Sequence, residues 1–234
     1  MSYFLCQDPL EIGEAGSLTD TEAHHALHAR RVRTGEHIEV QDGHERRFQA
    51  VVTKTNKHTV QFSVIAAIPT PPEPKRLLTL CMALTASATL DTVAQKATEL
   101  GVHALVLFPA DHSPNVKAIA KTDRWHKIAI EAAKQSGRAR PATVLYAPSL
   151  AETLVLPAAV RFYATQHAPT SPALPTPLPD SVCVWVGPEG GYSEKEVQAF
   201  AQANVTPLRL PGYVLRSETA ALASMALLQA QLQQ

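Results

Sequence analysis

The sequence lacks the features that mark several common classes of protein. It has three cysteines in 234 residues (Cys6, Cys81 and Cys183) and no CxxC pair, so we expect neither a disulfide framework nor a cysteine zinc site. Widely spaced free thiols suit a reducing compartment such as the cytoplasm. No apolar run is long enough to cross a bilayer, and the first residues lack the basic and apolar stretches of a signal peptide.

Four motifs of nucleotide binding and hydrolysis are also missing. Without GxxxxGK[ST] a P-loop is not expected, and without GxGxxG the chain has neither the usual dinucleotide site nor the glycine fingerprint of common Rossmann methyltransferases. HExxH and GxSxG are absent as well. The 21 Lys and Arg balance 21 Asp and Glu, so bulk charge does not indicate a nucleic-acid binder. The one dense cationic cluster is Arg30, Arg31 and Arg33.

The strongest positive signal is a glycine loop between a strand and a helix. Residues 181–185 form a short apolar run that predicts a buried strand. The segment 186–193, Val-Gly-Pro-Glu-Gly-Gly-Tyr-Ser, follows, and its paired glycines allow backbone N–H groups to approach a ligand. Ser193 and Glu196 then form a capping box that starts a helix. Such a loop presents main-chain donors to a small molecule. A tight turn that binds nothing remains an open alternative.

A second strand, glycine turn and helix start follow over 208–222. We expect a strand at 208–210, an N-cap at Ser217 and a helix from Glu218 to about Leu232. Arg216 stands beside this cap, where the partial positive charge of a helix N-terminus disfavours a cation. It is therefore either a functional residue or a side chain that points into water. The last helix is small or apolar nearly all round, which predicts that it is buried, with a second subunit as the candidate cover.

The chain divides at a proline-rich linker within residues 69–74. Residues 1–70 are expected to form a small β-rich barrel, with a helix over 19–29 that a Thr19–Glu22 capping box begins and a hairpin turn at Asp42–Gly43. His24, His25 and His28 have helical spacing but no carboxylate or cysteine partner in the pattern, so we interpret them as surface residues and expect no metal.

Beyond the linker the rhythm of strand and helix predicts an α/β domain with a parallel sheet covered on both faces. Residues 166–180 contain five prolines and predict a loop. We expect strands at 37–40, 48–53 and 59–65 in the first part, strands at 77–84, 104–108, 143–146 and 160–165 in the second, and helices at 90–100 and 123–136.

Several stretches together resemble one family. They are 186–193 with Leu215-Arg216-Ser217-Glu218-Thr219-Ala220, the helix segments 95–102 and 131–138, and the His-to-Arg segment 25–33 followed by Gly35. This combination resembles the ribosomal RNA small subunit methyltransferase E family of the SPOUT superfamily. The resemblance implies a PUA-like barrel at 1–70 that holds RNA and, at 76–234, an α/β methyltransferase domain with a deep trefoil knot. It also implies a homodimer.

The implied reaction is methyl transfer from S-adenosylmethionine to N3 of a uridine in 16S ribosomal RNA. Two alternatives stay open, namely the same fold acting on another RNA base and a non-catalytic RNA-binding assembly factor. Arg216 would stabilise negative charge on the uracil, and Glu189 would accept the proton, contact the ribose or cap its own turn. The expected cofactor residues are Val186, Gly187, Pro188, Gly191, Leu210, Gly212, Val214, Leu215, Thr219 and Ala220, and the expected RNA contacts are Arg30, Arg31, Arg33, Lys96, Arg138 and Arg140.

The chain departs from the family pattern at several cationic positions. Ala86 and Thr89 stand where the family often has Lys and Arg, and His112 stands where an Arg is expected. Pro211 and Tyr213 occupy a glycine and an arginine position. These changes bear on RNA binding more than on the cofactor loops.

Overall fold

The computed structural model describes residues 3–114, 122–168 and 174–233. The chain forms two compact units, one made of Met1–Glu73 with Ala133–Arg140 and the other of Pro74–Ala132 with Pro141–Gln234. Within the described residues, no helix is long and apolar enough to span a membrane. The boundaries inferred from the sequence, 1–70 and 76–234, remain a prediction.

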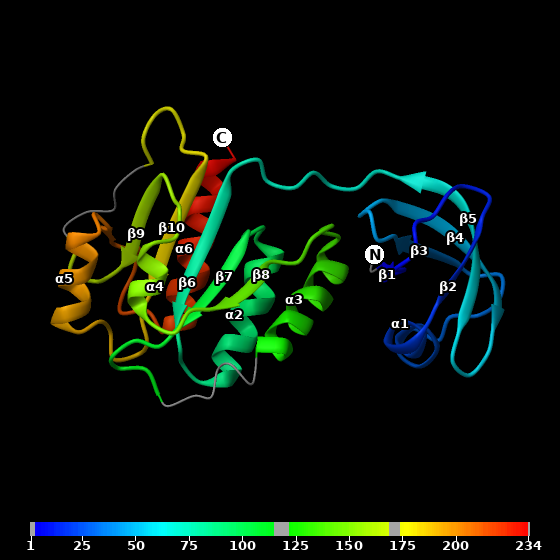
Figure 1. Ribbon diagram of the computed structural model, residues 1–234, viewed down its shortest axis with the longest axis horizontal. Coiled ribbons are helices and arrows are strands. Elements are labelled where there is room, and N and C mark those ends of the chain that lie inside the picture. Colours follow the sequence, from blue (N-terminus) through cyan, green and yellow to red (C-terminus); the bar gives the residue numbers. More distant parts are fainter. Residues whose placement is uncertain (1–2, 115–121, 169–173, 234) are drawn as a thin grey trace. The chain divides into compact units, whose positions relative to one another are not determined.

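The first unit is built on a five-stranded sheet in the order β1-β3-β4-β5-β2 (Figure 1). β1 pairs with β3 in parallel and the other pairs are antiparallel. Register shifts between β4 and β5 add local twist, which helps a sheet to curl around its apolar face. That face buries Leu18, Val40, Phe48 and Phe62. The strands are β1 Phe4–Leu5, β2 Ala15–Leu18, β3 His37–Gln41, β4 Arg47–Thr55 and β5 Val60–Ile68.

The helical segment of this unit begins without the expected capping box. α1 covers Asp20–His24 and continues as a π-helix over His25–Ala29, but the Thr19 side chain makes no capping hydrogen bond. The Glu22 carboxylate accepts instead from the backbone N–H of Leu5, at 3.0 Å, and from Lys134 Nζ, at 2.8 Å, in the Ala133–Arg140 segment of the same unit. These distant partners outcompete the local one, so the prediction of a Thr19–Glu22 box was wrong.

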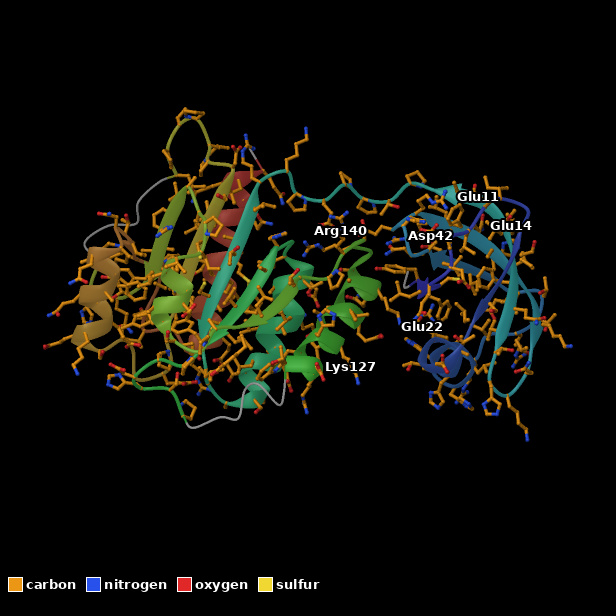
Figure 2. All side chains as sticks on the ribbon, in the orientation of Figure 1. Glu11, Glu14, Glu22, Asp42, Lys127 and Arg140 are labelled. Carbon is orange, nitrogen blue, oxygen red and sulfur yellow. The ribbon has the colours of Figure 1, made fainter. Side chains whose placement is uncertain are left out.

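The turn between β3 and β4 is organised by a buried carboxylate. Asp42 Oδ1 accepts from the backbone N–H groups of His44 and Arg46 at 3.0 and 2.9 Å, and Asp42 Oδ2 accepts from Leu10 N at 3.3 Å. Figure 2 labels Asp42 together with Glu11, the second carboxylate partner of the Arg46 guanidinium. Burial raises the pKa of Asp42, but these hydrogen bonds outweigh it, so its pKa lies below the ordinary value. The predicted Asp42–Gly43 hairpin turn is confirmed.

The second unit contains a six-stranded sheet in the order β11-β9-β10-β6-β7-β8, with every pair parallel. Buried side chains of α2, α3 and α6 cover one face, and those of α4 and α5 cover the other. The predicted α/β architecture with a doubly covered parallel sheet is confirmed. The strands are β6 Leu77–Ala83, β7 Ala104–Phe108, β8 Thr143–Tyr146, β9 Val160–Ala164, β10 Ser181–Val186 and β11 Thr206–Leu208. The helices are α2 Ser87–Glu99, α3 Thr122–Ser136, α4 Leu150–Leu154, α5 Glu194–Gln202 and α6 Ser217–Leu232, and the residues of α3 from Ala133 onward belong to the first unit.

Some element predictions need correction. The strand expected at 208–210 lies at Thr206–Leu208, where Pro207 is tolerated because β11 is the sheet edge. The short helix α4 was not predicted. Helix α6 is not buried all round in this chain, because Thr219, Ala226 and Ala230 are exposed. Part of the loop predicted at 166–180 lies outside the described residues.

Candidate active site

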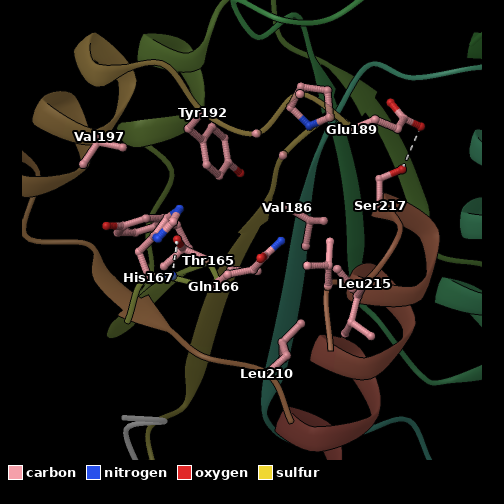
Figure 3. A pocket seen from close by; sticks show the side chains of 18 of the residues that line it. Thr165, Gln166, His167, Val186, Glu189, Tyr192, Val197, Leu210, Leu215 and Ser217 are labelled. Atoms are coloured by element: carbon pink, nitrogen blue, oxygen red, sulfur yellow. Dashed lines mark hydrogen bonds between the residues drawn. The ribbon is translucent and has the colours of Figure 1, made fainter. Parts of the chain in front are cut away.

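A cavity of about 280 Å³ opens at the carboxyl edge of the second sheet (Figure 3). β9, β10 and β11 are neighbours and run parallel, so the segments that follow them leave the sheet at the same edge. Ligands of open α/β sheets bind at this edge. The lining consists of Tyr163 to His167 at and after the end of β9, Val186 to Tyr192 at and after the end of β10, Val197 on α5, Leu210 and Tyr213 to Leu215 after β11, and Ser217 and Ala220 on α6.

The loop after β10 has the positive-φ glycine geometry that its sequence predicts. Gly191 has φ +71°, and its N–H donates to the carbonyl oxygen of Pro188 at 2.9 Å. A Cβ atom at Gly187 would meet the Tyr192 ring at 3.2 Å, so a side chain there would push the ring away. The Ser193–Glu196 capping box is confirmed, with both of its hydrogen bonds present. The loop is therefore held at both ends, by β10 and by α5.

A polar contact joins this loop to the start of α6. Ser217 Oγ donates to Glu189 Oε1 at 3.1 Å, which Figure 3 marks with a dashed line. Ser217 is buried as the first residue of α6, while Glu189 is exposed at the rim. The glycine loop and the helix are thus linked across the pocket mouth by residues 28 positions apart.

Arg216 itself, rather than Ser217, is the N-cap of α6. Its carbonyl accepts from the N–H of Ala220 at 2.8 Å, which begins the helical hydrogen bonding. Among the described residues no hydrogen bond or ion pair holds its guanidinium, which is exposed one residue from the pocket lining. A free cation at this cap is available to a negatively charged substrate.

Most of the expected cofactor residues lie in one place. Gly212 and Thr219 are not in the lining, although both neighbour residues that are. The expected residues that line the cavity are Val186, Gly187, Pro188, Gly191, Leu210, Val214, Leu215 and Ala220, together with Glu189.

Sequence reasoning missed the whole wall supplied by β9. Thr165, Gln166 and His167 follow this strand, and none of them belongs to a recognisable motif. They reach the pocket because β9 lies between β10 and β11, although β10 and β11 come later in the chain. The only available signal was that they follow an apolar strand of the parallel sheet.

An aromatic cluster supports the pocket from the α5 side. The Tyr192 ring lies edge-on to Phe200, with centroids 4.9 Å apart, and to Tyr163, at 6.0 Å. Burial raises the pKa of Tyr192 well above its ordinary value, so its hydroxyl stays protonated.

Comparison with known proteins identifies the family of this chain. Residues 71–229 match the model of an RNA methyltransferase domain, and residues 18–65 match that of an RNA methyltransferase PUA domain. The ribosomal RNA small subunit methyltransferase E of Bacillus subtilis is 30% identical over 242 residues, covering 96% of this chain and 94% of that protein. The chain belongs to the ribosomal RNA small subunit methyltransferase E family. A relative from Aquifex aeolicus is 28% identical, covering 76% of this chain and 78% of that protein.

One solved structure agrees with this membership of the methyltransferase E family, and a second shares the fold. A family member from Neisseria gonorrhoeae bound to S-adenosyl methionine has a TM-score of 0.86 and 28% identity, with 98% of this chain and 97% of that chain covered. A methyltransferase from Legionella pneumophila, solved with bound cofactor SAM, also has a TM-score of 0.86, at 23% identity and with 98% of both chains covered. The second likeness shows the fold alone.

One departure from the methyltransferase E pattern has a structural role. His112, which follows β7 where an arginine was expected, places Nδ1 3.1 Å from the Gly190 carbonyl oxygen and 3.2 Å from that of Gly191. Because carbonyl oxygens only accept, the imidazole Nδ1 must donate. A Cβ atom at Gly190 would lie 3.0 Å from His112 Cβ, so the glycine allows this close approach.

The expected RNA-binding cations fall into two groups. Arg30, Arg31 and Arg33 are exposed after the π-helix, with Arg31 at φ +54°. The other three form ion pairs, Lys96 with Glu99 at 2.9 Å, Arg138 with Glu73 at 2.9 Å and Arg140 with Glu45 at 2.6 Å. The first group is the more available to phosphate.

Proposed function

We propose that this protein methylates N3 of a uridine in 16S ribosomal RNA, with S-adenosylmethionine as the methyl donor. The observation that carries the proposal is the three-loop cavity at the carboxyl edge of β9, β10 and β11, in a member of the methyltransferase E family. A family member that shares the fold at a TM-score of 0.86 was solved with S-adenosyl methionine bound.

The cavity has the properties that this cofactor needs. Val186, Leu210 and Leu215 give it apolar walls suited to an adenine ring. Gly187 and Gly191 leave their backbone open to the ligand, and a side chain at Gly187 would disturb the wall. The Tyr192 hydroxyl is buried there without a hydrogen-bond partner in the described part of the chain. The residues present therefore fit the cofactor.

The bound cofactor supplies an electrophilic sulfonium methyl group. The protein must place uracil N3 in line with it, and such positioning accounts for several kcal/mol of rate enhancement, up to about 7–11 kcal/mol in well-oriented cases. Loss of the N3 proton leaves negative charge on the uracil, which the free guanidinium of Arg216 would stabilise. To Glu189 we assign the positioning of the glycine loop against α6, because its carboxylate already accepts from Ser217.

The proposal extends to the partners. The PUA unit, with Arg30, Arg31 and Arg33, would hold the RNA backbone, and Lys96, Arg138 and Arg140 would contribute if RNA displaces their carboxylate partners. We also propose a deep trefoil knot in the second unit and a homodimer, as the resemblance to the family implies. The exposed small residues of α6 support the homodimer, because they leave an apolar face uncovered in one chain. Since the proposed substrate is ribosomal RNA, we propose a cytoplasmic location.

The test is methyl incorporation from labelled S-adenosylmethionine into small ribosomal subunits of a strain that lacks the gene. We expect transfer, with nucleoside analysis of the digested 16S RNA yielding 3-methyluridine. A different methylated nucleoside would retain the methyltransferase and overturn the N3 assignment. No transfer, with RNA binding intact, would instead favour a non-catalytic assembly factor.

A further inference from the structure

The Tyr192 side chain combines a fixed ring with an unsatisfied hydroxyl. Its ring is held by Phe200 and Tyr163 and packs over Gly187, where an added Cβ would lie 3.2 Å away. Its Oη is buried, yet no hydrogen-bond partner for it exists among the described residues. Figure 3 shows the ring reaching from the glycine loop toward the interior of the pocket.

A buried hydroxyl without a hydrogen-bond partner destabilises the folded protein when no ligand is bound. Burial removes the hydrogen bonds that water would make, and nothing replaces them. Phenylalanine would keep the ring contacts and avoid the cost. Since burial also raises the pKa of Tyr192, the oxygen carries its proton and is ready to donate.

The position of Tyr192 Oη distinguishes it from the other buried polar atoms that lack a hydrogen-bond partner. Arg47 Nε, Thr85 Oγ1, Ser224 Oγ and Gln229 Oε1 also lack partners in the described part of the chain, but none of those residues lines this cavity. Tyr192 alone of this group borders the space in which the cofactor is proposed to bind.

We propose that Tyr192 Oη donates a hydrogen bond to S-adenosylmethionine, so that bound cofactor satisfies the hydroxyl that the empty pocket leaves unpaired. The inference rests on the proposed function, because it requires this cavity to be the cofactor site. It makes Tyr192 a cofactor-binding residue through its side chain, which the glycine pattern around it does not indicate.

The test compares Tyr192→Phe with the wild-type protein by calorimetric titration with S-adenosylmethionine and with its demethylated product, and by thermal unfolding without ligand. One lost hydrogen bond predicts a drop in affinity of about 3- to 10-fold. The same substitution should leave the unfolding midpoint of the free protein unchanged or higher. A lower affinity for the cofactor together with an unchanged or higher unfolding midpoint would show that the hydroxyl serves the ligand and not the fold.

Tyr146→Phe is the matched control, since Tyr146 ends β8, is half-buried and lies outside the cavity lining. It should not change cofactor affinity. Repeating the titrations with 5′-methylthioadenosine locates the partner atom: a retained affinity loss places it in the adenosine part, and a vanished loss places it in the amino-acid part.

The outcomes separate the two proposals. Cofactor binding by the wild-type protein with equal affinity in Tyr192→Phe would overturn the role of the hydroxyl and leave the proposed function standing. A clear fall in the unfolding midpoint of free Tyr192→Phe would also overturn it, by showing that Oη supports the fold. Failure of the wild-type protein to bind the cofactor would overturn both.

Discussion

At the scale of the residue, Arg216 is the group on which the proposed chemistry most depends. Its guanidinium stands at the N-cap of α6, where the helix dipole offers no stabilisation to a cation and no carboxylate holds it within the described structure. A position that is locally unfavourable and solvent-accessible suits a group that binds charge arriving with the substrate. Nothing in the packing of α6 requires it.

We therefore expect Arg216→Ala to reduce methyl transfer by about 10²- to 10³-fold, the usual cost of removing one electrostatic stabiliser of a transition state. The cofactor affinity and the unfolding midpoint should stay as they are, because no hydrogen bond or ion pair holds the guanidinium among the described residues. Radiolabel transfer to small subunits measures the rate. Arg124→Ala removes another exposed arginine, paired with Asp91, and should leave transfer intact. An unchanged rate for Arg216→Ala would remove this residue from the mechanism.

The pair Glu189 and Ser217 offers a second test at this scale. If the carboxylate positions the loop, Glu189→Ala and Ser217→Ala should each weaken cofactor binding by about 0.5–1.5 kcal/mol, and the double variant should lose little more than either. Titration of all three variants gives the coupling energy directly. Glu189→Gln keeps an oxygen acceptor for Ser217 Oγ and should retain most of the transfer rate. A loss in Glu189→Gln as severe as that of Arg216→Ala would instead identify Glu189 as the proton acceptor.

At the scale of the element, the β3–β4 turn makes the first unit sensitive to acid. Because the folded pKa of Asp42 lies below its unfolded value, the carboxylate stabilises the fold above about pH 4 and loses this contribution as the pH falls through the folded pKa. We expect Asp42→Asn to be less stable than the wild-type protein at pH 7, by about 1–3 kcal/mol for the broken turn. The difference should shrink toward pH 3.

Thermal unfolding of both proteins from pH 7 to pH 3 measures this convergence. Asp180→Asn changes an exposed carboxylate of the second unit and should follow the wild-type curve throughout. If the difference in unfolding midpoint between Asp42→Asn and the wild-type protein stays constant down to pH 3, Asp42 acts through its shape and not through its charge.

The two capping boxes show how far local sequence determines an element. Ser193 and Glu196 form both expected bonds, and Glu196 also accepts from Asp111 N, so tertiary structure reinforces the local pattern. Glu22 stands at the same spacing from Thr19, but its oxygens are taken by Leu5 and Lys134. No sequence window around Thr19 contains those partners, so the failure could not have been foreseen locally.

The pocket shows the same division between what local sequence predicts and what it cannot. The loops after β10 and β11 were predicted because glycines and helix starts mark them. The wall after β9 was not, because Gln166 and His167 carry no such mark and their role depends on the order of strands in the sheet. The orphan hydroxyl of Tyr192 is likewise visible only once burial is known.

At the scale of the whole molecule, helix α6 is the place to test self-association. Its buried stripe includes Ala221, Met225 and Leu228, while Ala226 and Ala230 are exposed on another face. If a second copy covers that face, Ala226→Glu should bury an unpaired charge in the interface and shift the protein to monomer.

Light scattering after gel filtration measures the mass. Ala201→Glu, an exposed alanine on α5, is the matched control and should remain dimeric. If Ala226→Glu has the same mass as the wild-type protein, this face of α6 is not the dimer contact.

The contact between His112 and the glycine loop has a consequence for the imidazole itself. Two carbonyl oxygens face Nδ1, so the neutral ring is fixed with its hydrogen on that nitrogen. The lone pair is then confined to Nε2. Free histidine in water prefers the opposite arrangement of hydrogen and lone pair. The loop has thus selected the minority tautomer, and any metal ion or electrophile that reaches this ring meets Nε2 as its basic atom.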